Sequence, residues 1–172
     1  MGVGISALRV DQALGGSWRR IVDADAPEAW WRFAHGSGTS VRDSSGHAHH
    51  GTAAGGVTPG VDPSVPEGGL AAAFDGVDGR VTLTTVAAQG TTLTVEVVIK
   101  PNTPAAEGTI LSNTDGTVRV SLTSARKINV RYSGADHLST TALTDQAWSH
   151  VLISISAGSG TFYRNGASDG TF

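Results

Sequence analysis

The 172-residue sequence contains no cysteine. This absence excludes a disulfide framework, a zinc–thiolate site and a cysteine nucleophile. The sequence also lacks a long apolar run, so we expect no transmembrane helix and no membrane insertion. Residues 1–12 contain neither a basic segment nor a true apolar segment, and we therefore expect no secretory signal.

The sequence also has little excess of either positive or negative charge. Lysine and arginine total 12, aspartate and glutamate total 15, and the net charge is −3. A protein that binds nucleic acid through a basic surface carries a clear excess of positive charge. We therefore expect no nucleic-acid partner.

Glycine, in contrast, is abundant, with 23 residues. The glycine fraction is nearly twice the average usage of about 7%. Low charge together with much glycine, serine and threonine indicates β-structure with many turns. The length is that of one domain.

Short strand-like runs separated by turn residues dominate the sequence. In residues 92–99, hydrophobic residues alternate with Thr92, Thr94 and Glu96, which is the period of a half-buried strand. Asn165-Gly166 is typical of a two-residue hairpin turn. The pattern predicts an all-β fold, an antiparallel β-sandwich or barrel. Strands are predicted at Ala29–Phe33, Leu70–Phe74, Arg80–Thr84, Thr91–Lys100, Thr109–Ser112, Val118–Thr123, Lys127–Tyr132, Ser139–Leu143, Trp148–Ser156 and Gly160–Arg164.

The N-terminal part is less regular. Residues 1–24 are predicted to be a short N-terminal arm or docking segment, followed by one domain over residues 25–172. Within that domain, residues 36–69 are rich in glycine and hold three prolines, Pro59, Pro63 and Pro66. We expect a surface loop region there, with room for one short strand.

Seven motifs follow one another in order along most of the chain. They are AWWRF at 29–33, DSSG at 43–46, HHGT at 49–52, AFDGVD at 73–78, TVEVVIKP at 94–101, WSHV at 148–151 and FYRNG at 162–166. Together they resemble laminin-G-like domains of the concanavalin A-like jelly-roll class. The resemblance implies a jelly-roll β-sandwich and is not specific for a ligand.

The sequence departs from that family pattern at two points. The family often has a second carboxylate after the turn at 75–76, where this chain has Gly79. It also usually closes with a further strand, which we expect this domain to lack after the Asn165-Gly166 hairpin. An unpaired sheet edge of that kind is suited to pairing with another chain.

Residues 18–33 are similar to the lead-in of such domains in minor tail proteins of phages that infect actinobacteria. The resemblance implies a non-enzymatic structural and interaction protein of a phage virion, located in the tail. Its partners would be other tail proteins and host surface glycan, and a homo-oligomer is expected. The alternative is a carbohydrate-binding, lectin-like module of a bacterial cell-surface or secreted protein, and a third hypothesis is a degraded glycan hydrolase.

Two aspartates and three histidines are candidate metal ligands. Asp75 and Asp78 lie three residues apart around a tight turn, where they could bind calcium with nearby carbonyl oxygens. The alternative is that both satisfy turn amides. His47, His49 and His50 could bind a metal ion, but no further zinc ligand is evident at a fixed spacing. The family resemblance implies instead that they belong to a turn motif. No other cofactor is predicted.

Other polar and aromatic residues bear on catalysis and ligand binding. Glycoside hydrolases of this fold need two carboxylates facing one sugar, and Glu96 has no acidic companion at Val98 or Pro101. We therefore predict no enzymatic activity and place Glu96 on a solvated sheet face or in a pair with an arginine. Trp18 and Trp30 are the candidate surface aromatics for stacking on a sugar ring, with sealing of the arm against the sandwich as their alternative role.

Overall fold

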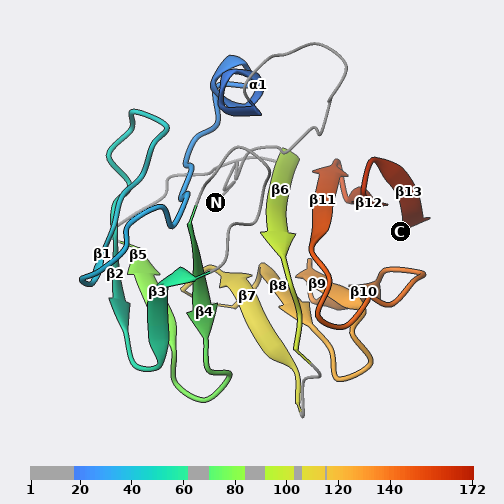
Figure 1. Ribbon diagram of the computed structural model, residues 1–172. Coiled ribbons are helices and arrows are strands. Elements are labelled where there is room, and N and C mark those ends of the chain that lie inside the picture. Colours follow the sequence, from blue (N-terminus) through green and yellow to red (C-terminus); the bar gives the residue numbers. More distant parts are fainter. Residues whose placement is uncertain (1–17, 62–69, 84–91, 103–105, 115) are drawn as a thin grey trace.

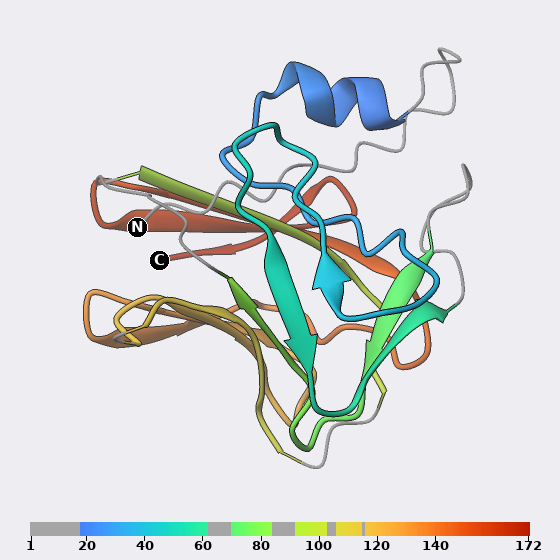
Figure 2. The same cartoon turned by 90° about the vertical axis from the view of Figure 1, so that its left-hand side faces the viewer.

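Two four-stranded antiparallel sheets packed face to face form the centre of the molecule. The structure is a computed structural model, which describes residues 18–61, 70–83, 92–102, 106–114 and 116–172. Figure 2 shows the two layers, one with the green and red strands and one with the yellow and orange strands. The first sheet has the order β13-β12-β11-β6 and the second the order β10-β9-β8-β7. The bounds are β6 Thr92–Ile99, β7 Gly108–Ser112, β8 Arg119–Leu122, β9 Ile128–Tyr132, β10 Ala135–Leu138, β11 Ser149–Ser156, β12 Ser159–Arg164 and β13 Ala167–Thr171. The predicted all-β antiparallel sandwich is confirmed.

Alternate side chains of both sheets point inward and make the core. One hydrophobic cluster contains Leu93, Val95, Val120, Leu122, Ile128, Val130, Leu143, Val151, Ile153, Ile155 and Phe162. Removing a side chain of this size from water contributes roughly 1.5–3 kcal/mol to folding. The alternation read from residues 92–99 therefore identifies the inward face of β6 correctly.

Two-residue turns connect the hairpins. Asn165 and Gly166 have φ values of 50° and 83°, and Ser133 and Gly134 have the same pair of values. Left-handed angles at both central positions define the turn that matches the twist of antiparallel strands. The predicted hairpin at Asn165-Gly166 is confirmed, and it continues into β13, which pairs with β12.

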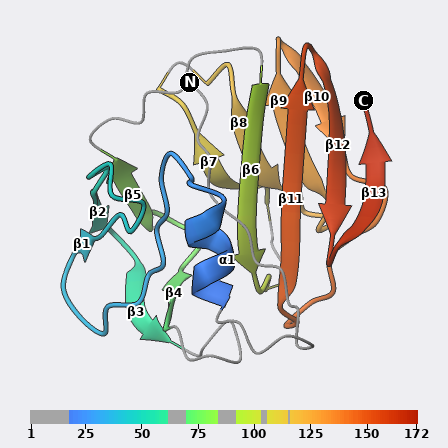
Figure 3. The same cartoon turned by 90° about the horizontal axis from the view of Figure 1, so that it is seen from above.

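Smaller sheets lie beside the sandwich, next to β6 and β7 (Figures 1 and 3). One sheet has the order β1-β2-β5 and a two-stranded ribbon joins β3 and β4. Their bounds are β1 Ser40–Val41, β2 Gly51–Ala54, β3 Val57–Val61, β4 Ala71–Phe74 and β5 Arg80–Leu83. Within the predicted loop region 36–69, the described residues 36–61 thus hold three short strands rather than the one expected.

A short helix, α1 (Trp18–Ala24), lies on the outer side of the layer that contains β6 and β11 (Figures 1 and 2). Its Val22 is fully buried. Most of the predicted arm, residues 1–17, lies outside the described residues. No helix within the described part of the chain is long and apolar enough to cross a membrane.

Two predicted strands are wrong. Residues 29–33 form isolated bridges at Ala29 and Trp31, the second of them to Asp43, rather than a strand, and Phe33 has a left-handed φ of 53°, which ends an extended run. Residues 139–143 do not form a strand either, because their backbone amides bond to different segments. The amide of Ser139 donates to Ile128 and that of Thr140 donates to Asp169.

Candidate functional site

A buried carboxylate organises the loop of residues 43–50. Asp43 is only 4% exposed. Its Oδ1 accepts the backbone N–H groups of Trp30 at 2.8 Å and Ser45 at 2.9 Å. Its Oδ2 accepts the Ser45 hydroxyl at 2.7 Å and the His49 backbone N–H at 2.9 Å. Four donors on one buried carboxylate hold two chain segments together.

These bonds also set the acidity of Asp43. Burial by itself would raise the pKa of this carboxyl group. The hydrogen bonds from Ser45, Trp30 and His49 together outweigh burial, and the pKa lies below its usual value. Asp43 is therefore the ionised anchor of the loop at neutral pH.

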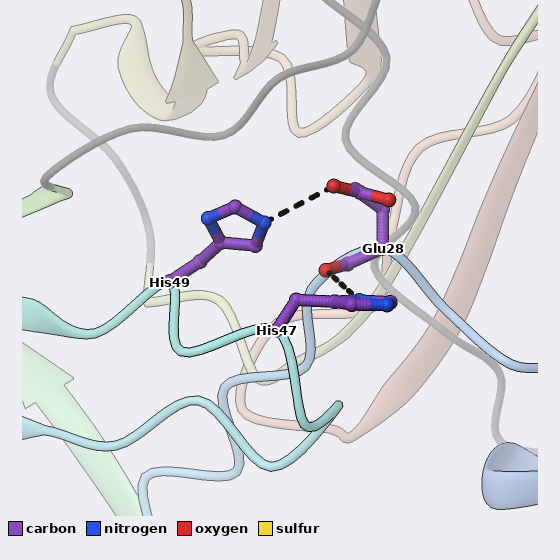
Figure 4. Close-up of side chains that lie close together, drawn as sticks. All are labelled: Glu28, His47 and His49. Atoms are coloured by element: carbon purple, nitrogen blue, oxygen red, sulfur yellow. Dashed lines mark hydrogen bonds and ion pairs between the residues drawn. The ribbon is translucent and has the colours of Figure 1, made fainter.

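The loop brings two histidines to Glu28, one to its side chain and one to its backbone oxygen. The His49 Nε2 atom lies 3.1 Å from Glu28 Oε1, and the His47 Nδ1 atom lies 3.0 Å from the Glu28 backbone oxygen (Figure 4). The three potential ligand atoms all lie within 4.8 Å of one another. The fold thus places a potential third ligand, Glu28, beside the two histidines. Sequence reasoning missed Glu28 because 19 and 21 residues separate it from the two histidines.

The predicted calcium ligands lie on a turn of their own. Asp75 Oδ1 accepts the backbone N–H groups of Val77, Asp78 and Gly79 at 2.9, 3.2 and 3.0 Å. Asp78 Oδ1 accepts the N–H of Gly56 at 2.9 Å. Both carboxylates thus serve as turn-amide acceptors, the role given above as the alternative. Calcium binding by the pair stays a prediction.

A close approach explains the glycine that faces this turn. A Cβ atom added at Gly56 would lie 2.0 Å from Asp75 Oδ2. The hydrogen bonds from Val77 and Gly79 lower the pKa of Asp75 against the small opposing effect of burial. The turn is therefore built around an ionised aspartate whose carboxylate packs against the backbone of a glycine.

The two candidate tryptophans have different outcomes. Trp30 is 3% exposed, and the guanidinium of Arg32 lies over its ring at 5.3 Å. The expectation that Trp30 is a surface aromatic is wrong, because a sugar cannot reach a ring that is buried in this way. Trp18 belongs to α1, but its side chain lies outside the described part, and its ligand role stays a prediction.

Glu96 has a partner that sequence reasoning did not anticipate. It is 2% exposed, and its carboxylate is hydrogen-bonded to His150 Nε2. Both side chains stand on the outer face of the first sheet, because His150 pairs with Val98, two residues along β6 from Glu96. We expected Glu96 to lie on a solvated face or to pair with an arginine. Instead it is shielded from solvent and paired with a histidine.

The other end of that outer face is lined with hydroxyl groups. Thr161 lies opposite Ser154 and Thr171, and Ser156 lies opposite Ser159, so these five side chains share one face. They surround a shallow hollow of about 340 Å³. Its lining consists of Ser154, Ser156, Ser159, Gly160, Thr161, Thr171 and Phe172. Each hydroxyl can donate one hydrogen bond and accept two, which suits a polyhydroxylated ligand.

Comparison with known proteins places this architecture in a family. The model of the concanavalin A-like lectin/glucanases superfamily matches residues 75–172, more than half of the chain. The chain therefore belongs to this superfamily, and the resemblance to laminin-G-like domains is confirmed at that level. No curated protein matches the chain with significance.

A solved structure is similar over most of the chain. It is an S-layer domain-containing protein, residues 221–444, from Clostridium thermocellum ATCC 27405. The sequences are 27% identical, and the alignment covers 84% of this chain and 71% of that chain with a TM-score of 0.50.

Proposed function

We propose that the chain is a non-enzymatic, lectin-like module of a bacterial cell-surface protein and that it binds carbohydrate. The observation that carries this proposal is the similarity to the S-layer domain-containing protein, together with membership of the lectin/glucanase superfamily. Fold alone does not define function, so the proposal also needs a site. The hydroxyl-lined hollow on β11, β12 and β13 supplies one.

The proposal of a binding module rather than a hydrolase is supported by Glu96. Glycoside hydrolysis needs a proton donor and a second carboxylate on opposite sides of the scissile bond. Glu96 is shielded and paired with His150, and Val98 and Pro101 stand where a second acid would be expected. The outer face of this sheet therefore offers a ligand hydroxyl groups rather than a pair of acids.

The phage-tail prediction has less support. It rests on the similarity of residues 18–33 to tail-protein lead-ins. Neither the matched superfamily nor the S-layer protein is described as viral. The cell-surface alternative is therefore the function proposed here.

Binding to bacterial cell-wall polysaccharides, measured by isothermal titration and on a glycan array, tests the proposal. We expect the wild-type chain to bind, and Thr161→Arg to weaken binding at least tenfold by filling the hollow. Thr58→Arg is the matched control, since Thr58 is an exposed threonine in β3, outside the sandwich sheets, and it should bind like wild type. A folded wild-type chain that binds no polysaccharide would overturn the proposal.

A further inference from the structure

The cluster of Glu28, His47 and His49 has the composition of a metal site. Imidazole nitrogen and carboxylate oxygen are both zinc ligands, with bonds of about 2.0–2.2 Å. Ligand atoms around a tetrahedral zinc ion therefore lie about 3.4 Å apart. The three ligand atoms here lie within 4.8 Å of one another. The Glu28 side chain is partly exposed, so its carboxylate can move to close this difference without disturbing the core.

We propose that Glu28, His47 and His49 bind one Zn²⁺ ion, independently of carbohydrate binding (Figure 4). The two histidines come from the loop that Asp43 organises, and Glu28 comes from the segment after α1. The described residues contain no other group of three potential ligands of this kind. The site therefore depends on how the fold joins these two segments.

Hydrogen bonds orient His47 as a ligand. A carbonyl oxygen can only accept, so the contact between His47 Nδ1 and the Glu28 oxygen requires the proton on Nδ1. The Nε2 atom of His47 then keeps its lone pair. Metal-binding histidines usually donate their other ring N–H to a carbonyl or carboxylate in this way, which fixes the tautomer and the ring orientation.

His49 is held in place from both sides of its peptide unit. Its backbone N–H donates to Asp43, and its backbone oxygen accepts the Trp31 indole N–H at 2.7 Å. Its side chain is 17% exposed and that of Glu28 is 39% exposed. One ligand is thus fixed and partly shielded, and the other two are accessible to an ion from solvent. A site whose ligands are positioned before binding loses less conformational entropy when the metal binds.

The donor set favours zinc over calcium. Calcium takes six to eight oxygen ligands, whereas two imidazoles and one carboxylate match the borderline-soft zinc ion. Three protein ligands leave the fourth tetrahedral position to water. On binding, the direct contact between His49 Nε2 and Glu28 Oε1 is replaced by two bonds to the metal. The ring proton of His49 then resides on Nδ1.

Zinc titration of the full-length, tag-free chain tests this inference. After treatment with EDTA and its removal, the chain is titrated with Zn²⁺ by calorimetry, and the melting temperature is measured with and without the ion. We expect one ion per chain and a higher melting temperature with zinc. Co²⁺ in place of zinc should give the visible absorption of a tetrahedral site. Calcium at the same concentration should neither bind to the two histidines nor raise the melting temperature through them.

Variants separate the cluster from histidines in general. His49→Gln and His47→Gln should each weaken zinc binding at least about 10-fold, and Glu28→Gln should do the same. His35→Gln is the control, because His35 lies outside the cluster, and it should bind like wild type. The melting temperature in EDTA shows whether each variant is folded, and Glu28→Gln preserves side-chain volume if a histidine variant is not. Absence of zinc binding by the wild type, or unchanged binding by the folded cluster variants, would overturn the inference.

Discussion

Residues 92–172 bury alternate aliphatic side chains between two four-stranded sheets, whereas residues 26–50 are joined by hydrogen bonds that converge on Asp43. The first region is a periodic hydrophobic structure with local hairpins. The second has few ladder bonds, and its backbone amides bond to a buried side chain instead. One chain thus satisfies its backbone hydrogen-bonding groups in two ways, through strand ladders and through a buried side chain. We therefore expect the two regions to fail differently when they are mutated.

The largest effect is expected in the sandwich. Phe162 is 1% exposed and lies in the core cluster. Phe162→Ala should lower the free energy of unfolding by about 3–5 kcal/mol, because it removes buried apolar contacts and leaves a cavity. Urea unfolding measures this change. Val77→Ala is the exposed control and should cost less than about 0.5 kcal/mol. Equal losses for the two variants would contradict the assigned core.

The next effect belongs to the region around Asp43. Asp43→Ala leaves the buried Trp30 amide without its acceptor and should cost about 2–3 kcal/mol. Hydrogen exchange should accelerate at Trp30, Ser45 and His49, while Ile153 in the sandwich keeps its protection. If exchange at Ile153 accelerated as much as at Trp30, the two regions would unfold as one unit. The distinction drawn here would then be wrong.

A smaller effect, with a sign that depends on position, concerns the hairpins. Ala157 has a left-handed φ of 49°, where a Cβ atom is unfavourable. Ala157→Gly should raise the free energy of unfolding by about 0.5–1 kcal/mol, since relief of that strain exceeds the entropy cost of glycine. Ala135→Gly, in the extended strand β10, should lower it by about the same amount. Thermal melts of both variants test the opposite signs, and equal signs would contradict the turn geometry.

The smallest effect is a pH dependence at the Asp75 turn. The folded-state pKa of Asp75 lies below the usual 3.8. Its ionised form therefore contributes stability that is fully present above about pH 4 and is lost as pH falls through the lowered pKa. The stability difference between wild type and Asp75→Asn, measured by urea unfolding, should shrink between pH 5 and pH 2. A difference that does not change with pH would show that the charge of Asp75 is irrelevant.

The same comparison explains what could be predicted from the sequence. The sandwich strands follow a local two-residue period, and the turn at Asn165-Gly166 carries its own signal, so β6, β11 and β12 were predictable. Burial of Trp30 and the contact between Glu28 and His49 depend on long-range bonds around Asp43, for which no fixed spacing exists. The five hydroxyl groups of the hollow share a face only once the pairing of β11, β12 and β13 is known.

Binding of a cell-wall polysaccharide to the protein in the presence of EDTA tests whether the hydroxyl-lined hollow is the carbohydrate site. The proposed site is made of hydroxyl groups and needs no metal ion. We predict that the wild type binds equally well with and without the chelator, and that Thr161→Arg binds at least tenfold more weakly. Binding that disappears with EDTA, or that survives Thr161→Arg unchanged, would contradict this prediction.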